Sequence, residues 1–348
     1  MSDSHAIAAQ AELHHQYFIG LQLMVAVEES RGTVYDWMFQ LFRRQHEEKF
    51  LSSFDKLGLR GLPDAIACAQ YHALSNRLGG VVVEYMEESV SKAWVRFRYP
   101  RWMYSGAAIC GIPVEASRGF LYGWYAKNGV SLNNPRLGFV CVSEDMTGQF
   151  GLCGYFKEFD YALSPEERLQ FAPNEGVPQF NPAQQPDPPN DQWNPERLAK
   201  ASRNYAVEYI RNGICALNAV VGRARAEELA GRAGRLIGLQ HYPQMAEQVS
   251  AVDGGASHAA EFLCSMMAGM GDACVQERLA DGTIVVTQTG LSIVRNLEGA
   301  DRHTMLVVWV ELWRGAIHSH RAFIDVQCDI TVECLRWSLS DTAGVLTP

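Results

Sequence analysis

His72 has the residue type and the neighbours best suited to chemistry in this chain. It lies in a segment, residues 64–78, whose apolar spacing predicts a helix. Ala65, Cys68 and Ala69 precede it at spacings of three and four, so a strip of small side chains leads to the imidazole. Such a strip leaves room for a flat group, as when a haem iron takes a histidine ligand. The alternative is close helix packing around a histidine that is hydrogen-bonded in the core.

The other histidines offer weaker patterns for binding a metal. His46 is a second candidate for the axial iron ligand, although the charged residues on both sides of it favour a solvated helix edge. We expect His14 and His15 at the surface. His318 and His320 are expected in a turn between a helix and a strand, where no nearby carboxylate or cysteine completes a metal site.

Three cysteines could supply a nucleophile. Cys68 precedes His72 by one helical turn, and Cys141 and Cys153 are expected on the two sides of a hairpin. A thiolate becomes reactive when a base or a positive charge lies beside it, and a buried thiol is otherwise inert. The chain has nine cysteines and no Cys-x-x-Cys pair, which favours free thiols in a reducing, cytoplasmic compartment.

Aromatic and arginine side chains alternate along one stretch of the first half. The series contains Trp94, Arg96, Phe97, Arg98, Tyr99, Arg101, Trp102 and Tyr104. Such a series can bind single-stranded nucleic acid, or its arginines can hold carboxylates such as haem propionates. A strand with a core face and an ion-paired face explains the same pattern. The net charge of -9 argues against nucleic acid or an anionic membrane surface as the main partner.

The length and composition are typical of a globular protein with two domains. The 348 residues are enough for two domains of ordinary size, and 47% are hydrophobic. The N-terminal residues lack the pattern of a secretory signal. The strongest apolar run, residues 305–310, is far shorter than a membrane span. No nucleophile elbow, phosphate-binding loop or His-Glu-x-x-His motif occurs in the chain.

The first half predicts helices followed by a small sheet. Thr33 is a suitable N-cap for one helix, and Gly61 to Pro63 separates it from the helix over residues 64–78. Alternation of side chains predicts β structure from Val81 to Tyr99. The remaining elements are expected as a helix over residues 114–127 and strands near residues 137–143 and 151–156.

The second half repeats this order. Residues 173–195 hold seven of the fourteen prolines and predict a linker or surface strap, with Asn194 as the cap of the helix that begins at Pro195. We expect that helical region to break near Gly213 and to reach about Leu239. Another helix follows to Met270, and a β–α–β pattern then runs to about Leu339.

The segments that close the two halves share residues at matching offsets. Residues 139–147 and residues 323–331 have Phe, Val, Asp and Thr at the same positions, which indicates a duplicated domain. We therefore predict an α+β fold with two tandem, diverged domains, each of helices and a small antiparallel sheet. Their expected bounds are residues 1–172 and 196–348, with the linker between them.

The order of elements resembles a superfamily that includes haem–nitric-oxide-binding domains, vinyl-reductase-type aromatic sensors and aminothiazoline carboxylate hydrolases. Ser117–Trp124 is similar to the arginine-bearing start of one helix in the haem-binding members. More narrowly, the chain resembles the trans-anethole oxygenase family in its length and in the stretches Lys92–Phe97, Asn133–Phe139 and Arg203–Tyr209.

This resemblance implies a haem-dependent oxygenase that cleaves or epoxidises the propenyl double bond of phenylpropenes and yields an aromatic aldehyde. In that hypothesis His72 binds the iron of haem b, and Arg96, Arg98 and Arg118 hold the cofactor. The substrate packs against Trp94, Trp102 and Trp124 and reacts with O2. A reductase could supply electrons, and an acidic, aromatic-rich surface is compatible with a homodimer. The alternatives are a cysteine hydrolase like the aminothiazoline enzymes and a sensor of small aromatics.

Overall fold

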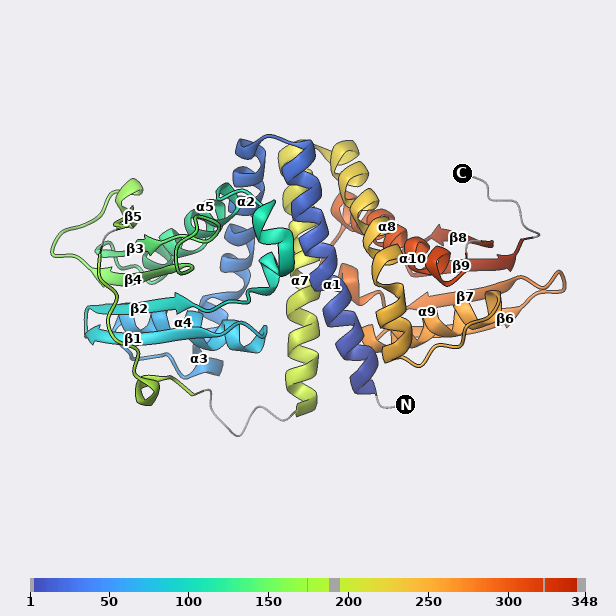
Figure 1. Ribbon diagram of the computed structural model, residues 1–348, viewed down its shortest axis with the longest axis horizontal. Coiled ribbons are helices and arrows are strands. Elements are labelled where there is room, and N and C mark those ends of the chain that lie inside the picture. Colours follow the sequence, from blue (N-terminus) through green and yellow to red (C-terminus); the bar gives the residue numbers. More distant parts are fainter. Residues whose placement is uncertain (1–2, 174, 188–194, 322, 343–348) are drawn as a thin grey trace. The chain divides into compact units, whose positions relative to one another are not determined.

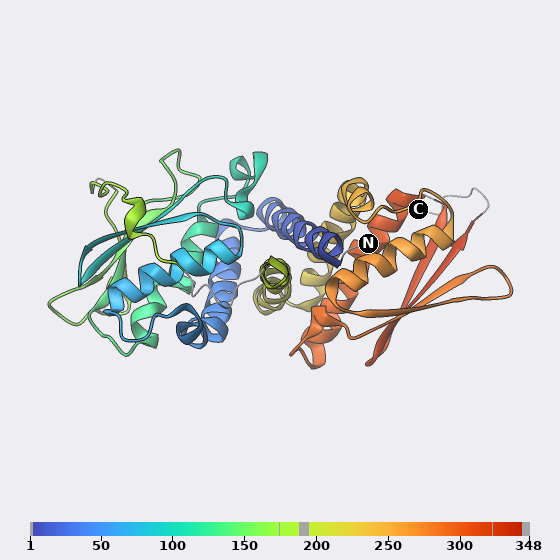
Figure 2. The ribbon, with the colours of Figure 1, turned by 90° about the horizontal axis from the view of Figure 1, so that it is seen from below.

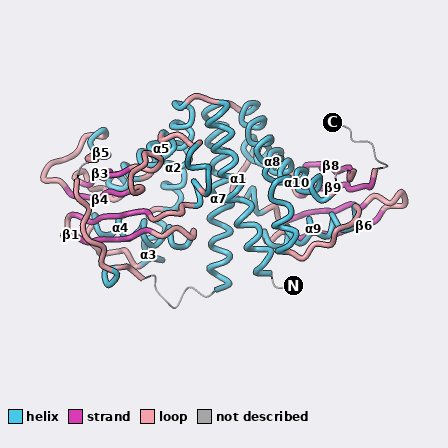
Figure 3. The backbone as a smooth tube through the Cα atoms, in the orientation of Figure 1, coloured by secondary structure: helices cyan, strands magenta, loops and turns pink. Residues whose placement is uncertain are grey.

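The computed structural model describes residues 3–173, 175–187, 195–321 and 323–342. It has an α+β fold with two sheets, whose strands are magenta in Figure 3. Two compact units divide the chain. The first-sheet unit is Val25–Leu198, and the second-sheet unit joins Met1–Met24 to Ala199–Pro348. This division differs from the expected boundaries, because the first 24 residues pack with the second half of the chain.

The first-sheet unit follows the predicted order of helices, strands, helix and strands. Its helices are α2 (Arg31–Lys49), α3 (Phe54–Leu57), α4 (Asp64–Leu78), α5 (Glu115–Gly123) and α6 (Asn128–Ser131). Its strands are β1 (Val83–Ser89), β2 (Lys92–Phe97), β3 (Leu137–Ser143), β4 (Cys153–Glu158) and β5 (Leu169–Phe171). Short 3-10 helices include η2 (Trp102–Tyr104), η3 (Gly106–Cys110) and η4 (Tyr125–Lys127). The helix predicted over residues 114–127 is thus divided between α5 and η4.

The second-sheet unit repeats this order with longer helices. Its helices are α1 (Asp3–Glu28), most of which belongs to this unit, α7 (Pro195–Val221), α8 (Arg223–Gln248), α9 (Ala256–Met270) and α10 (Gly299–His320). Its strands are β6 (Ala273–Arg278), β7 (Ile284–Thr289), β8 (Ile324–Ile330) and β9 (Cys334–Asp341). The break expected at Gly213 is wrong: α7 continues to Val221 and ends before Gly222, whose φ of 81° favours glycine.

Both sheets have the same strand order, which confirms the repeated pattern predicted for the two halves. The first sheet is ordered β1-β2-β4-β3-β5, and the second β6-β7-β9-β8. All pairs are antiparallel except β3 with β5. In each unit one helix packs across three strands of the sheet, α4 in the first and α9 in the second (Figures 1 and 2). The fifth strand, β5, distinguishes the first sheet.

Glycines bring one pair of helices close together in each unit. A Cβ atom on Gly119 of α5 would lie 2.5 Å from the Tyr35 carbonyl oxygen of α2. A Cβ atom on Gly315 of α10 would collide with the Arg235 carbonyl oxygen of α8. The absence of a side chain therefore allows the backbones of α2 and α5, and of α8 and α10, to touch.

The two faces of the first sheet bury different parts of the core. Residues alternate between faces along each strand, so Trp94 and Tyr155 lie on one face and Val95 and Phe156 on the other. Trp94 and Tyr155 belong to a buried cluster with Met86, Val140, Val142 and Cys153. We call this side the outer face, and the side that carries α4 the helix face.

The N-terminal helix shows that the expected exposure of His14 is wrong. His14 is fully buried, its Nδ1 lies 2.7 Å from the Gln10 carbonyl oxygen, and Trp309 of α10 donates to its Nε2 at 3.2 Å. Tyr17 of the same helix donates to the Ala230 carbonyl oxygen at 2.7 Å. His318 and His320 lie in the last turn of α10, not in the expected turn, because α10 continues to His320.

Candidate functional site

His72 lies in the core of the first-sheet unit among aromatic rings. Its ring stacks on Tyr125 at a centroid distance of 4.1 Å and lies parallel to Phe156 of β4 at 5.5 Å. Its Nε2 is 3.3 Å from the side-chain nitrogen of Asn128. Burial lowers the pKa of His72 well below its ordinary value, and His46 lowers it further. The imidazole is therefore neutral at physiological pH.

His46 is buried as well, so the solvated helix edge expected for it is wrong. Its Nε2 lies 2.9 Å from Ser131 Oγ, and its ring stacks on Phe50 at 4.6 Å. Trp124 lies between the two histidines, 5.5 Å from His46 and 6.1 Å from His72. Burial lowers the pKa of His46 to about 3, helped by nearby cations. The helices α2 and α4 thus bring both histidines to one aromatic cluster.

The other predicted site residues lie away from His72 or are engaged elsewhere. Trp94 and Arg96 are on the outer face of the sheet, whereas His72 packs on Phe156 of the helix face. Arg98 binds Glu84 at 2.7 Å. Trp102 lies in η2, and Arg118 of α5 pairs with Glu144 at 2.8 Å.

The side chains around His72 do not fit a haem as they are packed. An iron atom on Nε2 would need the space that the Asn128 amide occupies. Tyr125 and Phe156 both pack against the imidazole, and their own ring centroids are 5.4 Å apart, so aromatic side chains fill the space beside it that a porphyrin would need. The arginines expected to hold the propionates are paired with glutamates, and Arg96 lies on the opposite face of the sheet.

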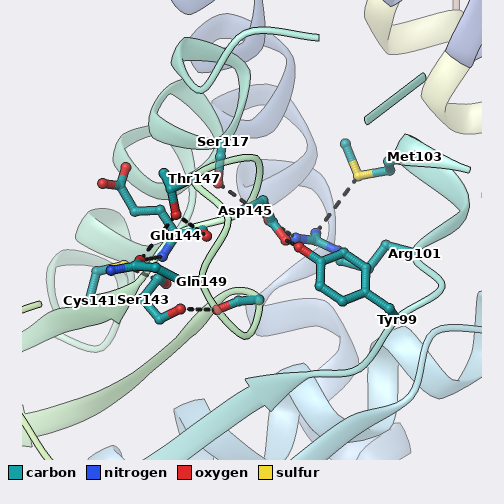
Figure 4. Close-up of polar contacts among 11 residues, drawn as sticks. Tyr99, Arg101, Met103, Ser117, Cys141, Ser143, Glu144, Asp145, Thr147 and Gln149 are labelled. Atoms are coloured by element: carbon teal, nitrogen blue, oxygen red, sulfur yellow. Dashed lines mark hydrogen bonds and ion pairs between the residues drawn. The ribbon is translucent and has the colours of Figure 1, made fainter. Parts of the chain in front are cut away.

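A second cluster centres on the buried ion pair between Arg101 and Asp145 (Figure 4). Arg101 follows β2, and Asp145 lies in the turn after β3, so both sit beyond the same end of the sheet. Ser117 of α5 lies 3.4 Å from the Asp145 carboxylate, and the Tyr99 hydroxyl lies 3.5 Å from it. Arg101 also stacks over the Phe97 ring at 4.3 Å. The carboxylate therefore meets one cation and two hydroxyls in the core.

Burial controls the charges in this cluster. It raises the pKa of Asp145, and the Arg101 guanidinium and the hydrogen bonds to Asp145 oppose this rise. Burial also raises the pKa values of Tyr99 and Tyr104, which keeps both phenols protonated. The Tyr104 hydroxyl has no hydrogen-bond partner among the described residues. The cluster can donate hydrogen bonds from neutral hydroxyls and holds its carboxylate in place.

A pocket of about 600 Å³ adjoins this cluster through Tyr99. Its lining is Arg31, Tyr99, Ile109, Cys110, Ile112, Pro113, Val114, Met146, Thr147, Gly148 and Gln149. These residues come from the start of α2, from Tyr99 after β2, from the end of η3 and the segment that leads to α5, and from the turn between β3 and β4. Ligand sites of this size are typically apolar with a few polar groups that orient the ligand, and this lining has both.

The three cysteines considered from the sequence are buried in this unit. Burial raises the pKa of Cys68 well above its ordinary value, raises that of Cys141, and raises that of Cys153 to about 12. They are therefore protonated and shielded from solvent. Cys110, which sequence reasoning passed over, is exposed and lines the pocket.

Sequence reasoning also missed Arg101, Asp145 and Ser117 as a group. They stand in three separate segments of the chain, and no spacing rule brings them together. One available signal was Asp145 itself, a charged residue that closely follows the apolar strand Leu137–Ser143. A second was Arg101 in the dense aromatic series.

Comparison with family models, with curated proteins and with solved structures finds no match to this chain. Within the described residues, no group of three or more His, Cys, Asp or Glu side chains is arranged to hold a metal ion. The helices in the described part of the chain are all too short or too polar to cross a bilayer.

Proposed function

We propose that the first-sheet unit binds a small, largely apolar aromatic molecule in the pocket beside Tyr99. We further propose that this molecule is the substrate of a cytoplasmic oxygenase acting on the propenyl double bond of aryl alkenes. The observation that carries the binding proposal is the pocket itself, which combines the apolar side chains of Ile109, Ile112 and Met146 with the phenol of Tyr99. The resemblance to trans-anethole oxygenases supplies the reaction.

The chemistry of the lining suits a phenylpropene better than a charged ligand. Apolar side chains stabilise an aromatic ring by removing it from water. The Tyr99 phenol stays protonated and faces Asp145 Oδ1, so its oxygen can accept a hydrogen bond from a hydroxyl group on that ring. Asp145 and Arg101 lie behind Tyr99 and restrict where its hydroxyl can point. The pocket thus offers apolar contact and polar contacts from Tyr99 and from Arg31, Thr147 and Gln149.

Oxygen transfer needs a group that activates O2, which side chains alone do not do easily. Because the residues around His72 do not fit a haem, the proposal assigns no step to a haem at that histidine. The role left for this chain's residues is to bind and orient the alkene and to keep water from it. A reductase that supplies electrons remains part of the proposal.

A titration of the purified full-length protein with trans-anethole, followed by tryptophan fluorescence, tests the binding step. We expect saturable binding that benzoate, a charged ring of similar size, does not show. An absorption spectrum before and after dithionite, with an assay for aromatic aldehyde under O2, tests the reaction. Anethole binding without aldehyde would favour the sensor alternative, and absence of anethole binding would contradict the whole proposal.

The position of Cys110 in the pocket is the reason to retain the cysteine-hydrolase alternative. All nine cysteines lie in described parts of the chain, and Cys110 is the exposed one. Among the residues that line the pocket with it there is no histidine to act as its base. Alkylation of Cys110 that abolishes turnover of a thiazoline carboxylate would support that alternative over the oxygenase.

A further inference from the structure

Two cysteines meet where α9 packs on the edge of the second sheet. Cys264 lies on α9, and Cys274 lies on β6, which packs against that helix. Cys274 pairs with Gln288 of β7, and the two side chains of such a pair lie on the same face of a sheet. Gln288 is buried and its side chain bonds Trp337 of β9. Cys274 therefore points to the helix-covered side of the sheet, towards α9.

Cys264 and Cys274 are neighbouring side chains on this face, and each thiol affects the acidity of the other. The Gln276 amide, two residues along the same strand and thus on the same face, donates to Cys264 Sγ at 3.1 Å. Packing of α9 on β6 thus brings the two cysteines into one neighbourhood, and a disulfide requires their Cβ atoms to approach to about 4 Å.

Access to this pair is open from the edge of the sheet. Both cysteines are half-buried, unlike the fully buried Cys68, Cys141 and Cys153. Strand β6 is the outermost strand of its sheet, and most of its residues are exposed. A small oxidant can therefore reach the sulfurs without unfolding of the unit.

The two thiols also differ in acidity, as a reacting pair requires. The hydrogen bond from Cys274 and the bond from Gln276 lower the pKa of Cys264, while the same contact raises the pKa of Cys274. The thiolate is the form that attacks an oxidant. Cys264 is thus the attacking sulfur, and Cys274 is the second thiol that completes the bond.

We propose that Cys264 and Cys274 are a modification site that closes to a reversible disulfide when the protein meets a peroxide. The Cys264 thiolate attacks hydrogen peroxide, the O–O bond breaks, and a sulfenic acid forms with release of hydroxide, which takes a proton to become water. Cys274 then attacks the sulfenic sulfur, and the S–S bond forms with loss of a second water. Two thiols are oxidised by two electrons, and one peroxide is reduced to two waters.

The chain allows a direct test by peptide mass. Trypsin leaves both cysteines on one peptide, residues 236–278, because no Lys or Arg lies between Arg235 and Arg278. The full-length protein is treated with hydrogen peroxide, alkylated in denaturant and digested. We expect this peptide to lose two hydrogens and to take no alkyl group, and to take two alkyl groups after dithiothreitol. Cleavage at Met266, Met267 and Met270 with cyanogen bromide then separates the cysteines onto two fragments that only the disulfide joins.

Matched variants identify the partners. Cys264→Ser and Cys274→Ser should each abolish the crosslinked fragments, while Cys328→Ser, which removes another half-buried cysteine, should leave them. Circular dichroism checks that each variant is folded. The proposal is overturned if peroxide leaves both thiols of the unaltered protein open to alkylation. The proposal is also overturned if peroxide converts Cys264 to sulfinic acid without the crosslink, or links either cysteine to a different partner.

Discussion

The hydroxyl of Tyr99 lies 3.5 Å from Asp145 Oδ1, so one wall of the pocket touches a carboxylate that is otherwise fully buried. Tyr99 itself is 44% exposed, which leaves its ring available to a ligand. The same side chain therefore meets both the buried ion pair and the pocket. A change in the ion pair should alter the pocket through this residue.

We predict that Asp145→Asn destabilises the protein by about 3–5 kcal/mol, because it leaves the buried Arg101 guanidinium without its counter-charge. Glu144→Gln is the matched control, since its partner Arg118 is 46% exposed and exposed pairs contribute about 1 kcal/mol or less. Urea unfolding of the two variants measures the difference. Equal losses in both variants would mean that burial of the Arg101 pair has no special importance.

A large side chain in the pocket should block binding of an aromatic ligand. Ile109 is half-buried and lines the pocket, so Ile109→Trp fills part of its volume. We expect anethole affinity to fall at least about tenfold, which corresponds to roughly 1.4 kcal/mol. Val90→Trp, at an exposed position in the turn between β1 and β2, controls for the added indole. Unchanged affinity in Ile109→Trp would place the ligand elsewhere.

Stability should fall as the pH is lowered below about 6.5. Burial lowers the pKa of His14 to about 4 and that of His46 to about 3. Between pH 6.5 and these values the unfolded chain therefore binds protons that the folded chain does not bind. The stabilisation is complete above pH 6.5 and is lost progressively towards the folded pKa. At pH 5 the loss from His14 alone is about 2 kcal/mol.

Urea unfolding at several pH values measures this dependence. Replacement of His14 by Gln removes the titrating group, and we expect a shallower slope between pH 7 and pH 5 than in the unaltered protein. His303, which is exposed on α10, provides a comparison in His303→Gln. A pH profile that His14→Gln leaves unchanged would contradict this assignment.

The close helix approach predicts opposite effects of the same substitution at two glycines. Gly119→Ala forces a methyl group against the α2 backbone and should cost about 1–3 kcal/mol. Gly32→Ala, in the first turn of α2, meets nothing closer than 3.6 Å and should stabilise the helix by up to about 1 kcal/mol. Thermal unfolding of both variants gives the signs. A stabilised Gly119→Ala protein would show that α2 and α5 can separate at little cost.

Much of the fold followed from the sequence because hydrophobic period and turn residues act locally. The helix over residues 64–78 is correct at both ends, and so is the strand over residues 137–143. The repeated pattern correctly predicted two similar sheets. The expected break at Gly213 was wrong, because a glycine inside a long buried helix is tolerated when tertiary packing stabilises that helix.

The candidate site depended on tertiary structure to a greater extent. Residue type alone singled out His72, but only the packing showed its neutral ring against Tyr125 and Phe156. The hypothesis drawn from the sequence placed Trp94 and His72 in one site. The alternation of side chains along β2 instead puts Trp94 on the opposite face of the sheet.

The sequence by itself determined the two repeated halves, the helix that carries His72 and the strand pattern, since each depends on neighbours along the chain. Only the tertiary structure decided which polar groups meet. Arg101, Ser117 and Asp145 come together because α5 and the ends of β2 and β3 converge, and Cys264 meets Cys274 because α9 packs on β6. Contacts between residues far apart in the chain depend on how whole elements pack, and no local pattern encodes that.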